Sequence, residues 1–148
     1  MKSINTILIA NRGEIASRVI RTCKSIGIKT IAIHSPIDLN ATYTQEADLA
    51  ISIGDNAPKS SYLNQKLIIE TALNHGADAI HPGYGFLSEN VEFAENCKKA
   101  DLIFIGPNSK AIRAMASKSE AKILMKEHQV PTIPGYQGEN QNTDHLIN

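Results

Sequence analysis

The sequence predicts an open, doubly wound α/β fold with a mainly parallel sheet. Five short apolar segments recur along the 148 residues with little alternation of polar side chains, as is typical of strands covered on both faces. Segments with apolar residues at three- and four-residue steps lie between them and predict helices. Because right-handed crossovers gather the strand-to-helix turns at one edge of such a sheet, we expect ligands to bind there. The predicted strands are residues 6–10, 29–34, 49–53, 78–81 and 102–106.

Three helices are predicted between these strands. The first pattern ends at Gly27, a residue type that favours the end of a helix. After the last strand Ser109 is in position to cap a further helix, and residues 118–128 form another helical pattern. The stripes that predict the first three helices are Ile15, Val19, Ile20, Cys23 and Ile26, then Leu63, Leu67, Ile68 and Ala72, then Phe93, Ala94 and Cys97.

Composition and charge narrow the class of protein. Hydrophobic residues make up 42% of the chain, enough to bury a core, so we expect a globular domain. The 15 basic and 15 acidic side chains cancel, which argues against a nucleic-acid partner. No apolar run reaches the roughly 18 residues of a membrane span, and the first residues lack a signal-peptide core, so we expect a cytoplasmic protein with no membrane partner. Cys23 and Cys97 lack the paired spacing of a metal or redox site, and no metal site is expected.

The first predicted turn contains Asn11, Arg12, Gly13 and Glu14. It has one glycine where a dinucleotide-binding fingerprint has three, and His34 ends the second strand where such folds place an acid, so a nicotinamide site is not favoured. Backbone amides at the start of the following helix are able to hold an anion. The structural alternative is that Gly13 permits a tight turn and Arg12 pairs with a neighbouring acid. Both interpretations remain open at this point.

The second turn, residues 81–90, is the most informative stretch of the chain. Gly83 and Gly85 allow the backbone to approach a ligand or to adopt a positive φ. Capping of the next helix by Ser88, Glu89 or Asn90 explains part of this sequence but not Tyr84 and His81, so we favour a functional turn. His81 considered alone is more often a structural histidine than a catalyst.

Lys118 opens the helical pattern at residues 118–128. A lysine there is able to reach phosphate, although a solvated surface lysine is the default interpretation. The sequence contains no nucleophile, base and acid arrangement, no paired-histidine metal site and no phosphate-wrapping glycine run. The chain therefore holds no complete catalytic set.

Four segments together resemble the amino-terminal domain of biotin carboxylases, which are ATP-grasp ligases. They are residues 9–16 (Ile-Ala-Asn-Arg-Gly-Glu-Ile-Ala), 61–63 (Ser-Tyr-Leu), 81–90 and 104–107 (Phe-Ile-Gly-Pro). The resemblance spans residues 4 to about 140 and implies a Rossmann-like pre-ATP-grasp domain over 1–115, followed by the first helices of an ATP-grasp domain over 116–148. Residues 135–141 (Gly-Tyr-Gln-Gly-Glu-Asn-Gln) resemble the α subunits of acyl-CoA carboxylases, particularly the methylcrotonoyl type, more than they resemble the stand-alone bacterial subunit.

The resemblance implies an ATP- and bicarbonate-dependent carboxylation of biotin. In the family, ATP activates bicarbonate as carboxyphosphate, and the carboxyl group passes to biotin on a carrier domain. By resemblance Lys118 contacts ATP, and Tyr84 and Gly85 border the pocket for biotin and bicarbonate. Arg21 matches a dimer contact of the family, with a solvated arginine as the plain alternative. The implied cofactors are ATP, Mg²⁺ and biotin, none of which we expect this chain to bind firmly alone.

The implied partners are the remaining ATP-grasp domain, the biotin carboxyl carrier domain, the carboxyltransferase subunit and a second copy in a homodimer. Two departures from the family, Ile37-Asp38 and Ala116-Ser117 before Lys118, do not look disabling. The family's glycine-rich lid, magnesium-binding glutamates and bicarbonate-activating residues would lie beyond residue 148, so we expect the chain alone to be inactive. The alternatives are a binding or assembly module that docks on a separate ATP-grasp partner, and an unrelated nucleotide-binding α/β module.

Overall fold

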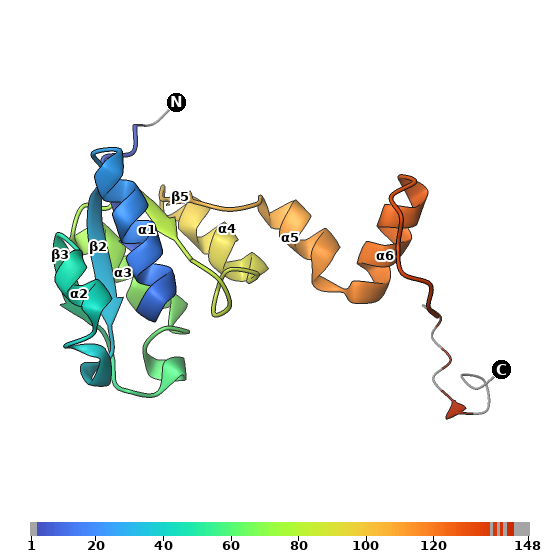
Figure 1. Ribbon diagram of the computed structural model, residues 1–148, viewed down its shortest axis with the longest axis horizontal. Coiled ribbons are helices and arrows are strands. Elements are labelled where there is room, and N and C mark those ends of the chain that lie inside the picture. The colour runs from blue at the N-terminus through green and yellow to red at the C-terminus, as the bar shows by residue number, and fades with distance from the viewer. Residues whose placement is uncertain (1–2, 137, 139, 141, 144–148) are drawn as a thin grey trace. The chain divides into compact units, whose positions relative to one another are not determined.

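The computed structural model describes residues 3–136, 138, 140 and 142–143. Residues 6–104 contain a five-stranded sheet in which all neighbouring strands are parallel (Figure 1). The strand order is β3-β2-β1-β4-β5. This order places the first strand in the middle, which is the doubly wound topology that the sequence predicts. The α/β fold is therefore confirmed. The strands are β1 (Thr6–Ile9), β2 (Lys29–His34), β3 (Leu49–Ser52), β4 (Ala79–His81) and β5 (Ile103–Phe104).

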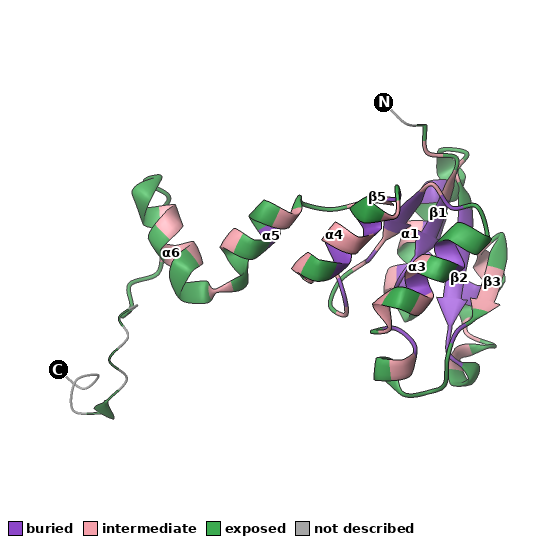
Figure 2. Cartoon of the chain, turned by 180° about the vertical axis from the view of Figure 1, so that it is seen from behind, coloured by how far each residue is buried: buried purple, intermediate pink, exposed green. Residues whose placement is uncertain are grey.

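Helices cover both faces of the sheet. One face packs against α1 (Gly13–Ser25) and α2 (Thr42–Glu46), and the other packs against α3 (Gln65–Asn74) and α4 (Val91–Lys99). Strand β1 contributes to both cores, because Ile7 and Ile9 face α1 whereas Leu8 faces α3 and α4. The central strands are accordingly the most buried part of the sheet (Figure 2). Two short 3₁₀ turns, η1 (Pro36–Asp38) and η2 (Pro58–Ser60), complete the connections.

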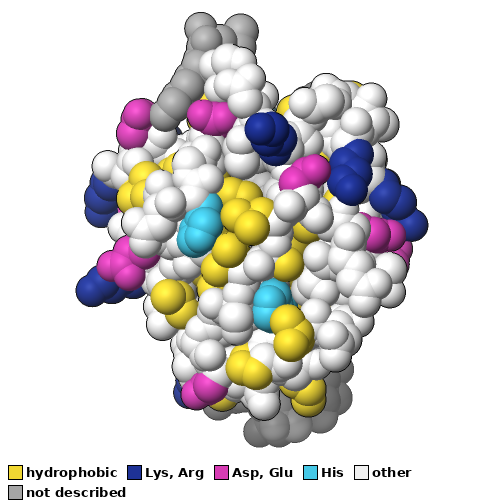
Figure 3. All heavy atoms as spheres, turned by 90° about the vertical axis from the view of Figure 1, so that its left-hand side faces the viewer, with side chains coloured by type: hydrophobic (Ala, Val, Ile, Leu, Met, Phe, Trp, Pro, Cys, Tyr) yellow, Lys and Arg dark blue, Asp and Glu magenta, His cyan; other side chains and the backbone are white. Residues whose placement is uncertain are grey.

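The expectation that all five strands are covered on both faces was wrong for the strands at the edges. Leu49 of β3 is 42% exposed, and Ile51 is half-buried. Hydrophobic side chains reach the surface on the side of the molecule where β3 lies (Figure 3). The edge strands are more exposed because the strand order leaves β3 and β5 with one neighbouring strand each. An apolar run does not distinguish an edge strand from a central one.

Several predicted boundaries also differ from the observed ones. Strands β1 and β3 end one residue early, but the sheet hydrogen bonds continue, because the N–H groups of Ala10 and Ile53 still donate to the carbonyls of His81 and His34. Leu63 lies outside α3, because the Asn64 side chain accepts from the N–H of Leu67 and caps the helix there. Residues 78, 102, 105 and 106 also lie outside the strands.

Helix ends follow the local signals in the sequence. Gly27 has φ +74° just after α1, as its proposed role as a stop requires. The cap of α4 is Asn90, whose side chain accepts from the N–H of Phe93 at 2.8 Å. Glu89 and Ser88 precede the cap and do not provide it.

The chain divides into two compact units, Met1–Ser109 and Lys110–Asn148, and each is described by itself. Helix α5 (Ser109–Ala116) begins at Ser109, and α6 (Lys118–Glu127) is capped by Ser117, whose hydroxyl accepts from the N–H of Glu120. The predicted domain boundary after residue 115 stays a prediction. Residues 137, 139, 141 and 144–148, some of which fall in the segment that resembles acyl-CoA carboxylases, lie outside the described residues.

Within the described residues, none of the helices combines the length and the apolar character that crossing a membrane requires.

Candidate functional site

Asn11 joins the first and second turns into one surface. Its side-chain amide donates to the carbonyls of Pro82 at 2.8 Å and Tyr84 at 2.9 Å, and its side-chain oxygen accepts from the N–H of Arg12 at 2.9 Å. Asn11 is buried, with 1% of its surface exposed. The two turns are neighbours because they follow β1 and β4, which pair in parallel. The carboxyl edge of the sheet therefore brings together the two segments that the sequence singles out.

Glycine is required at Gly83 for two reasons. Its φ is +64°, a region that other residues enter at a cost, and a side chain there would meet Asn11 Nδ2 at 2.6 Å and Ile15 Cγ2 at 2.8 Å. Gly85 has a similar φ of +65°, but a side chain there would meet nothing within 4 Å. Gly83 thus allows the turn to pack against Asn11, whereas Gly85 leaves open space above its backbone.

His81 has a structural hydrogen bond. Its Nδ1 accepts from the N–H of Gly83 at 3.0 Å, so this nitrogen carries no proton in the folded turn. Burial lowers the pKa of His81, which also favours the neutral imidazole. The geometry supports the structural interpretation of this side chain and assigns it no catalytic step.

A hollow of about 490 Å³ lies between the two turns. It is lined by residues 11–15 and 84–86, and Tyr84 is 64% exposed beside it. Gly13, with φ +60°, begins α1 at its floor, and Glu14 in the first turn of α1 is exposed. Because this hollow contains open backbone and the N-terminal end of a helix, it is the candidate functional site.

Arg12 adopts the structural pairing that the sequence leaves open. Its Nη1 lies 3.4 Å from Asp38 Oδ2. Its guanidinium carbon lies 5.4 Å from the ring centre of Tyr62 and 5.7 Å from that of Phe86, and these two rings stack 5.3 Å apart. Such cation–π contacts hold a guanidinium in place at the edge of the site. Phe86 takes φ +42°, so the stacking is reached with a strained backbone.

The half-buried Asp38 and two buried tyrosines form a network that sequence reasoning missed. Asp38 Oδ2 accepts from the Tyr62 hydroxyl at 2.6 Å and from the Ser35 hydroxyl at 3.0 Å. The Tyr62 hydroxyl in turn accepts from the N–H of Ser35 and lies 3.1 Å from the hydroxyl of Tyr43. The only signal in the sequence was the position of Asp38 in the turn that follows the second strand, at the same edge as the other turns.

The network shifts the acidity of its members. Burial by itself would raise the pKa of Asp38, but hydrogen bonds from Tyr62, Ser35 and Arg12, with the positive charge of Arg12, outweigh it and hold the pKa below its ordinary value. Burial raises the pKa of Tyr62, and its hydrogen bond to Asp38 adds to this effect. Burial likewise raises the pKa of Tyr43. At neutral pH the site edge therefore holds a carboxylate that contacts a guanidinium and the neutral phenol of Tyr62, and the neutral phenol of Tyr43 contacts Tyr62 in turn.

We predict that Asp38→Asn destabilises the protein by about 1 kcal/mol at pH 7, a modest loss because Arg12 is 46% exposed and its ion pair is screened. Since the folded pKa of Asp38 is depressed, its contribution is present above about pH 4 and is lost as the pH falls through the folded pKa. Urea unfolding at several pH values measures this. A stability difference from the wild-type chain that does not shrink below pH 4 would contradict the role of the carboxylate.

The remaining candidate residues lie outside this hollow. Arg21 is exposed on α1 and lines a neighbouring hollow together with Glu46 of α2, and that hollow shares Gly13 and Glu14 with the candidate site. Glu89 is exposed before α4. Lys118 is exposed at the start of α6 and is described only with the second unit.

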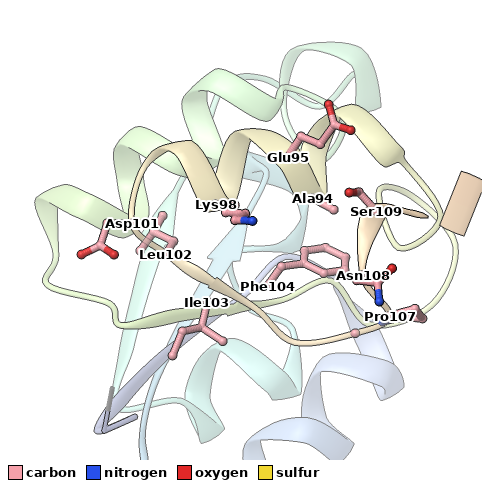
Figure 4. Close-up of a pocket in the computed structure, with 11 residues that line it drawn as sticks. Ala94, Glu95, Lys98, Asp101, Leu102, Ile103, Phe104, Pro107, Asn108 and Ser109 are labelled. Atoms are coloured by element: carbon pink, nitrogen blue, oxygen red, sulfur yellow. The ribbon is translucent and has the colours of Figure 1, made fainter. Parts of the chain in front are cut away.

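The turn after β5 borders a different hollow, of about 460 Å³, beside α4 (Figure 4). Phe104 lies at its base, 6.0 Å from the ring of Phe93, and a side chain at Gly106 would meet the Phe104 ring at 2.7 Å. The hollow shares no lining residue with the site between the first and second turns. The turn after β5 therefore borders its own hollow, apart from the site between the first and second turns.

The fold and the site define a Rossmann-like α/β domain with a crevice at the carboxyl ends of its strands. The chain belongs to the biotin carboxylase N-terminal domain family, whose model matches residues 3–112. It is 56% identical over 142 residues to the mitochondrial methylcrotonoyl-CoA carboxylase subunit alpha of Dictyostelium discoideum, covering 96% of this chain and 20% of that relative. It is also 56% identical over 132 residues to the biotin carboxylase of Nostoc sp., covering 89% of this chain and 30% of that protein.

A solved structure agrees with these relatives. The biotin carboxylase domain dimer of Hydrogenobacter thermophilus 2-oxoglutarate carboxylase, in complex with MgADP, ADP and bicarbonate, superposes with a TM-score of 0.89 at 46% identity. The match covers 97% of this chain and 32% of that one. The chain thus spans about a fifth to a third of the length of these relatives.

Proposed function

We propose that this chain supplies the amino-terminal part of an ATP- and bicarbonate-dependent biotin carboxylase, and that the turns at 11–14 and 81–90 form one side of its carboxylation pocket. The observation that carries the proposal is the pair of hydrogen bonds from Asn11, which fix the second turn against the first. They hold Tyr84 and Gly85 at an open hollow, in a family whose solved relative is in complex with bicarbonate. The second turn is thereby preorganised before any ligand arrives.

The residues of this chain have binding and positioning roles in the proposal. Gly85 leaves its backbone accessible, and the exposed Tyr84 borders the space where biotin and bicarbonate would meet. Arg12 is occupied by Asp38, Tyr62 and Phe86, so we give it a role in shaping the turn. ATP, when bound, supplies the phosphoryl group that activates bicarbonate, and biotin supplies the acceptor nitrogen.

Magnesium would be held elsewhere in the proposed enzyme. Among the residues that the structure describes, no group of three or more His, Cys, Asp or Glu side chains is arranged to hold a metal ion.

The wider assembly is also a proposal. The matched relatives are carboxylases, so the partners we propose are the remaining ATP-grasp domain, a biotin carboxyl carrier domain and a carboxyltransferase subunit. The solved Hydrogenobacter relative is a domain dimer, which supports a second copy as a further partner, with Arg21 as a contact. The acyl-CoA acceptor and a cytoplasmic location stay predictions, since one matched relative is mitochondrial and another is bacterial.

The test compares the chain alone with a chimera. In the chimera this chain replaces its matched segment in the Nostoc biotin carboxylase. We expect the chimera to hydrolyse ATP in a manner that requires bicarbonate and free biotin, and the isolated chain to show no such activity. A folded chimera without activity, or carboxybiotin formed by the isolated chain, would overturn the proposal.

Lys118 provides a more specific prediction. If it contacts ATP, Lys118→Gln in the active chimera should raise the KM for ATP by about tenfold or more, because a charged contact to phosphate is lost. Lys110→Gln is the matched control, since Lys110 is also an exposed lysine in the first turn of a helix of the second unit. Steady-state kinetics measure both variants. Equal KM values for ATP in the two variants would mean that Lys118 is a solvated surface lysine and does not contact ATP.

A further inference from the structure

Tyr62 lies where the connections after four strands meet. Its hydroxyl contacts Ser35 and Asp38 in the connection after β2, and its ring stacks on Phe86 of the second turn, which follows β4. Arg12 of the first turn, which follows β1, lies over the same ring. Tyr62 itself belongs to the connection after β3, between η2 and α3. It is 1% exposed and does not line the hollow of the candidate site, so its effect on a ligand there is indirect.

The backbone that carries Tyr62 is held close to the end of β3. Gly54 has φ +52°, and a side chain there would collide with the carbonyl of Ser60. The N–H of Leu63 donates to the carbonyl of Pro58 at 2.7 Å, which closes the chain around Tyr62. These contacts fix the backbone end of the tyrosine side chain.

The hydroxyl at the other end of this side chain is fixed as well. It donates to Asp38 Oδ2 at 2.6 Å and accepts from the N–H of Ser35 at 2.9 Å. A hydrogen bond to a carboxylate is stronger than one between neutral groups. Because both ends of the Tyr62 side chain are held, the plane of its ring is fixed.

Phe86 receives this fixed ring in a strained conformation. Its φ of +42° costs free energy for a residue with a side chain, so contacts of the side chain must offset that cost. The ring of Tyr62 provides such a contact, with 5.3 Å between the ring centres and 20° between the planes. Since Phe86 directly follows Tyr84 and Gly85, the stacking holds these two residues from one side, as Asn11 holds the turn from the other.

We propose that Tyr62 is a positioning residue for the ligand of the second turn, because its anchored ring holds Phe86 in the conformation that keeps Tyr84 and Gly85 at the hollow. The inference rests on the proposed function, in which biotin meets bicarbonate at this turn. Tyr62 touches neither ligand and acts through Phe86. Without the anchor, the turn keeps its hydrogen bonds to Asn11 but loses its hold at Phe86, so the backbone at Gly85 moves and the ligand binds more weakly.

Steady-state kinetics of the chimera with the Nostoc enzyme test the effect on binding. Tyr62→Leu removes the ring and the hydroxyl, and it should raise the KM for free biotin by about tenfold or more, because small displacements of binding groups have large effects. Tyr62→Phe keeps the stacked ring and loses only the anchor, so its KM for biotin should rise less. The KM for ATP should stay unchanged in both variants. A purely structural role would reduce the amount of active enzyme and leave the KM for biotin unaltered.

Amide hydrogen exchange in the isolated chain tests the hold on the turn without any activity. The N–H of Ser88 donates to the carbonyl of Gly85 at 2.9 Å, so its exchange rate measures how often the second turn opens. Tyr62→Phe should speed this exchange by about tenfold. The matched control is Ile68→Val, which also removes one heavy atom from a fully buried side chain of the same core, and which should speed the exchange far less.

The two measurements separate this inference from the proposed function. Unchanged Ser88 exchange in Tyr62→Phe, or an equal acceleration by Ile68→Val, would overturn the inference whether or not the chimera is active. An active chimera in which Tyr62→Phe leaves the KM for biotin unaltered would also overturn it, and this result does not require Tyr62→Leu to fold. A folded but inactive chimera, together with faster Ser88 exchange in Tyr62→Phe, would refute the proposed function and leave the hold of Tyr62 on the turn in place.

Discussion

Replacing Gly83 with alanine is expected to destabilise the protein by about 3 kcal/mol, whereas the same change at Gly85 should cost about 1 kcal/mol. The two glycines have nearly the same φ, +64° and +65°, so the backbone cost of adding a side chain is shared. Only at Gly83 would the new carbon collide with Asn11 Nδ2 at 2.6 Å and Ile15 Cγ2 at 2.8 Å. The difference between the two variants therefore isolates the close packing of the second turn on the first.

Urea unfolding followed by circular dichroism measures the stability of both variants. An equal slope of the unfolding free energy against urea concentration would confirm that the unfolded state is unchanged. The contact atoms of Asn11 are held by two carbonyls and cannot move aside cheaply. Equal costs for the two variants would mean that the turns are not packed as closely as the structure has them. In the active chimera Gly83→Ala should also reduce activity, since the turn would be displaced from the pocket.

The sequence predicted the parts of this fold that depend on neighbouring residues. The apolar run of β1 and the stripe of α1 are local patterns, and Gly27 and Asn90 mark helix ends through their own backbone or side-chain chemistry. The strand order depends instead on which runs pair across long stretches of chain. The apolar run at Leu49 has the sequence pattern of a central strand. In the structure, β3 pairs only with β2 and is therefore an edge strand.

In the candidate site, too, local features could be predicted from the sequence and long-range contacts could not. The turn at 81–90 could be found from its glycines and its aromatic residue. The roles within it could not, because they depend on Asn11, which lies 71 residues from Pro82 in the sequence. The contact between Asp38 and Tyr62 spans 24 residues and leaves no periodic signal. Side-chain hydrogen bonds between turns follow from the topology, so only the folded structure reveals them.

Asn11→Asp is expected to cause the largest loss of stability, about 3–5 kcal/mol at pH 7, because it buries an unpaired negative charge. The Asn11 amide nitrogen donates to two carbonyl oxygens at 2.8 and 2.9 Å. A carboxylate oxygen in its place would face those two acceptors with no proton to share and almost no water, since Asn11 is 1% exposed. The size of the change is a single atom, so packing is preserved and only the hydrogen bonding differs.

The matched control is Asn64→Asp, which makes the same atomic change where the side chain acts as an acceptor. Asn64 caps α3 by accepting from the N–H of Leu67 at 3.1 Å, and an aspartate at a helix start accepts equally well, so stability should change by less than about 0.5 kcal/mol.

Acid should partly restore the Asn11→Asp variant. Burial would raise the folded pKa of the new carboxyl above its unfolded value of about 3.9. The unfolded chain then releases the proton first, so the penalty relative to wild type is full above the folded pKa and shrinks as the pH falls toward 4. Once protonated, the acid donates to one of the two carbonyls again. The difference in unfolding free energy between the variant and the wild-type chain should therefore depend on pH. If this difference stays constant from pH 7 to pH 4, the variant is destabilised by altered packing and not by a buried charge. The two turns would then be joined by packing alone.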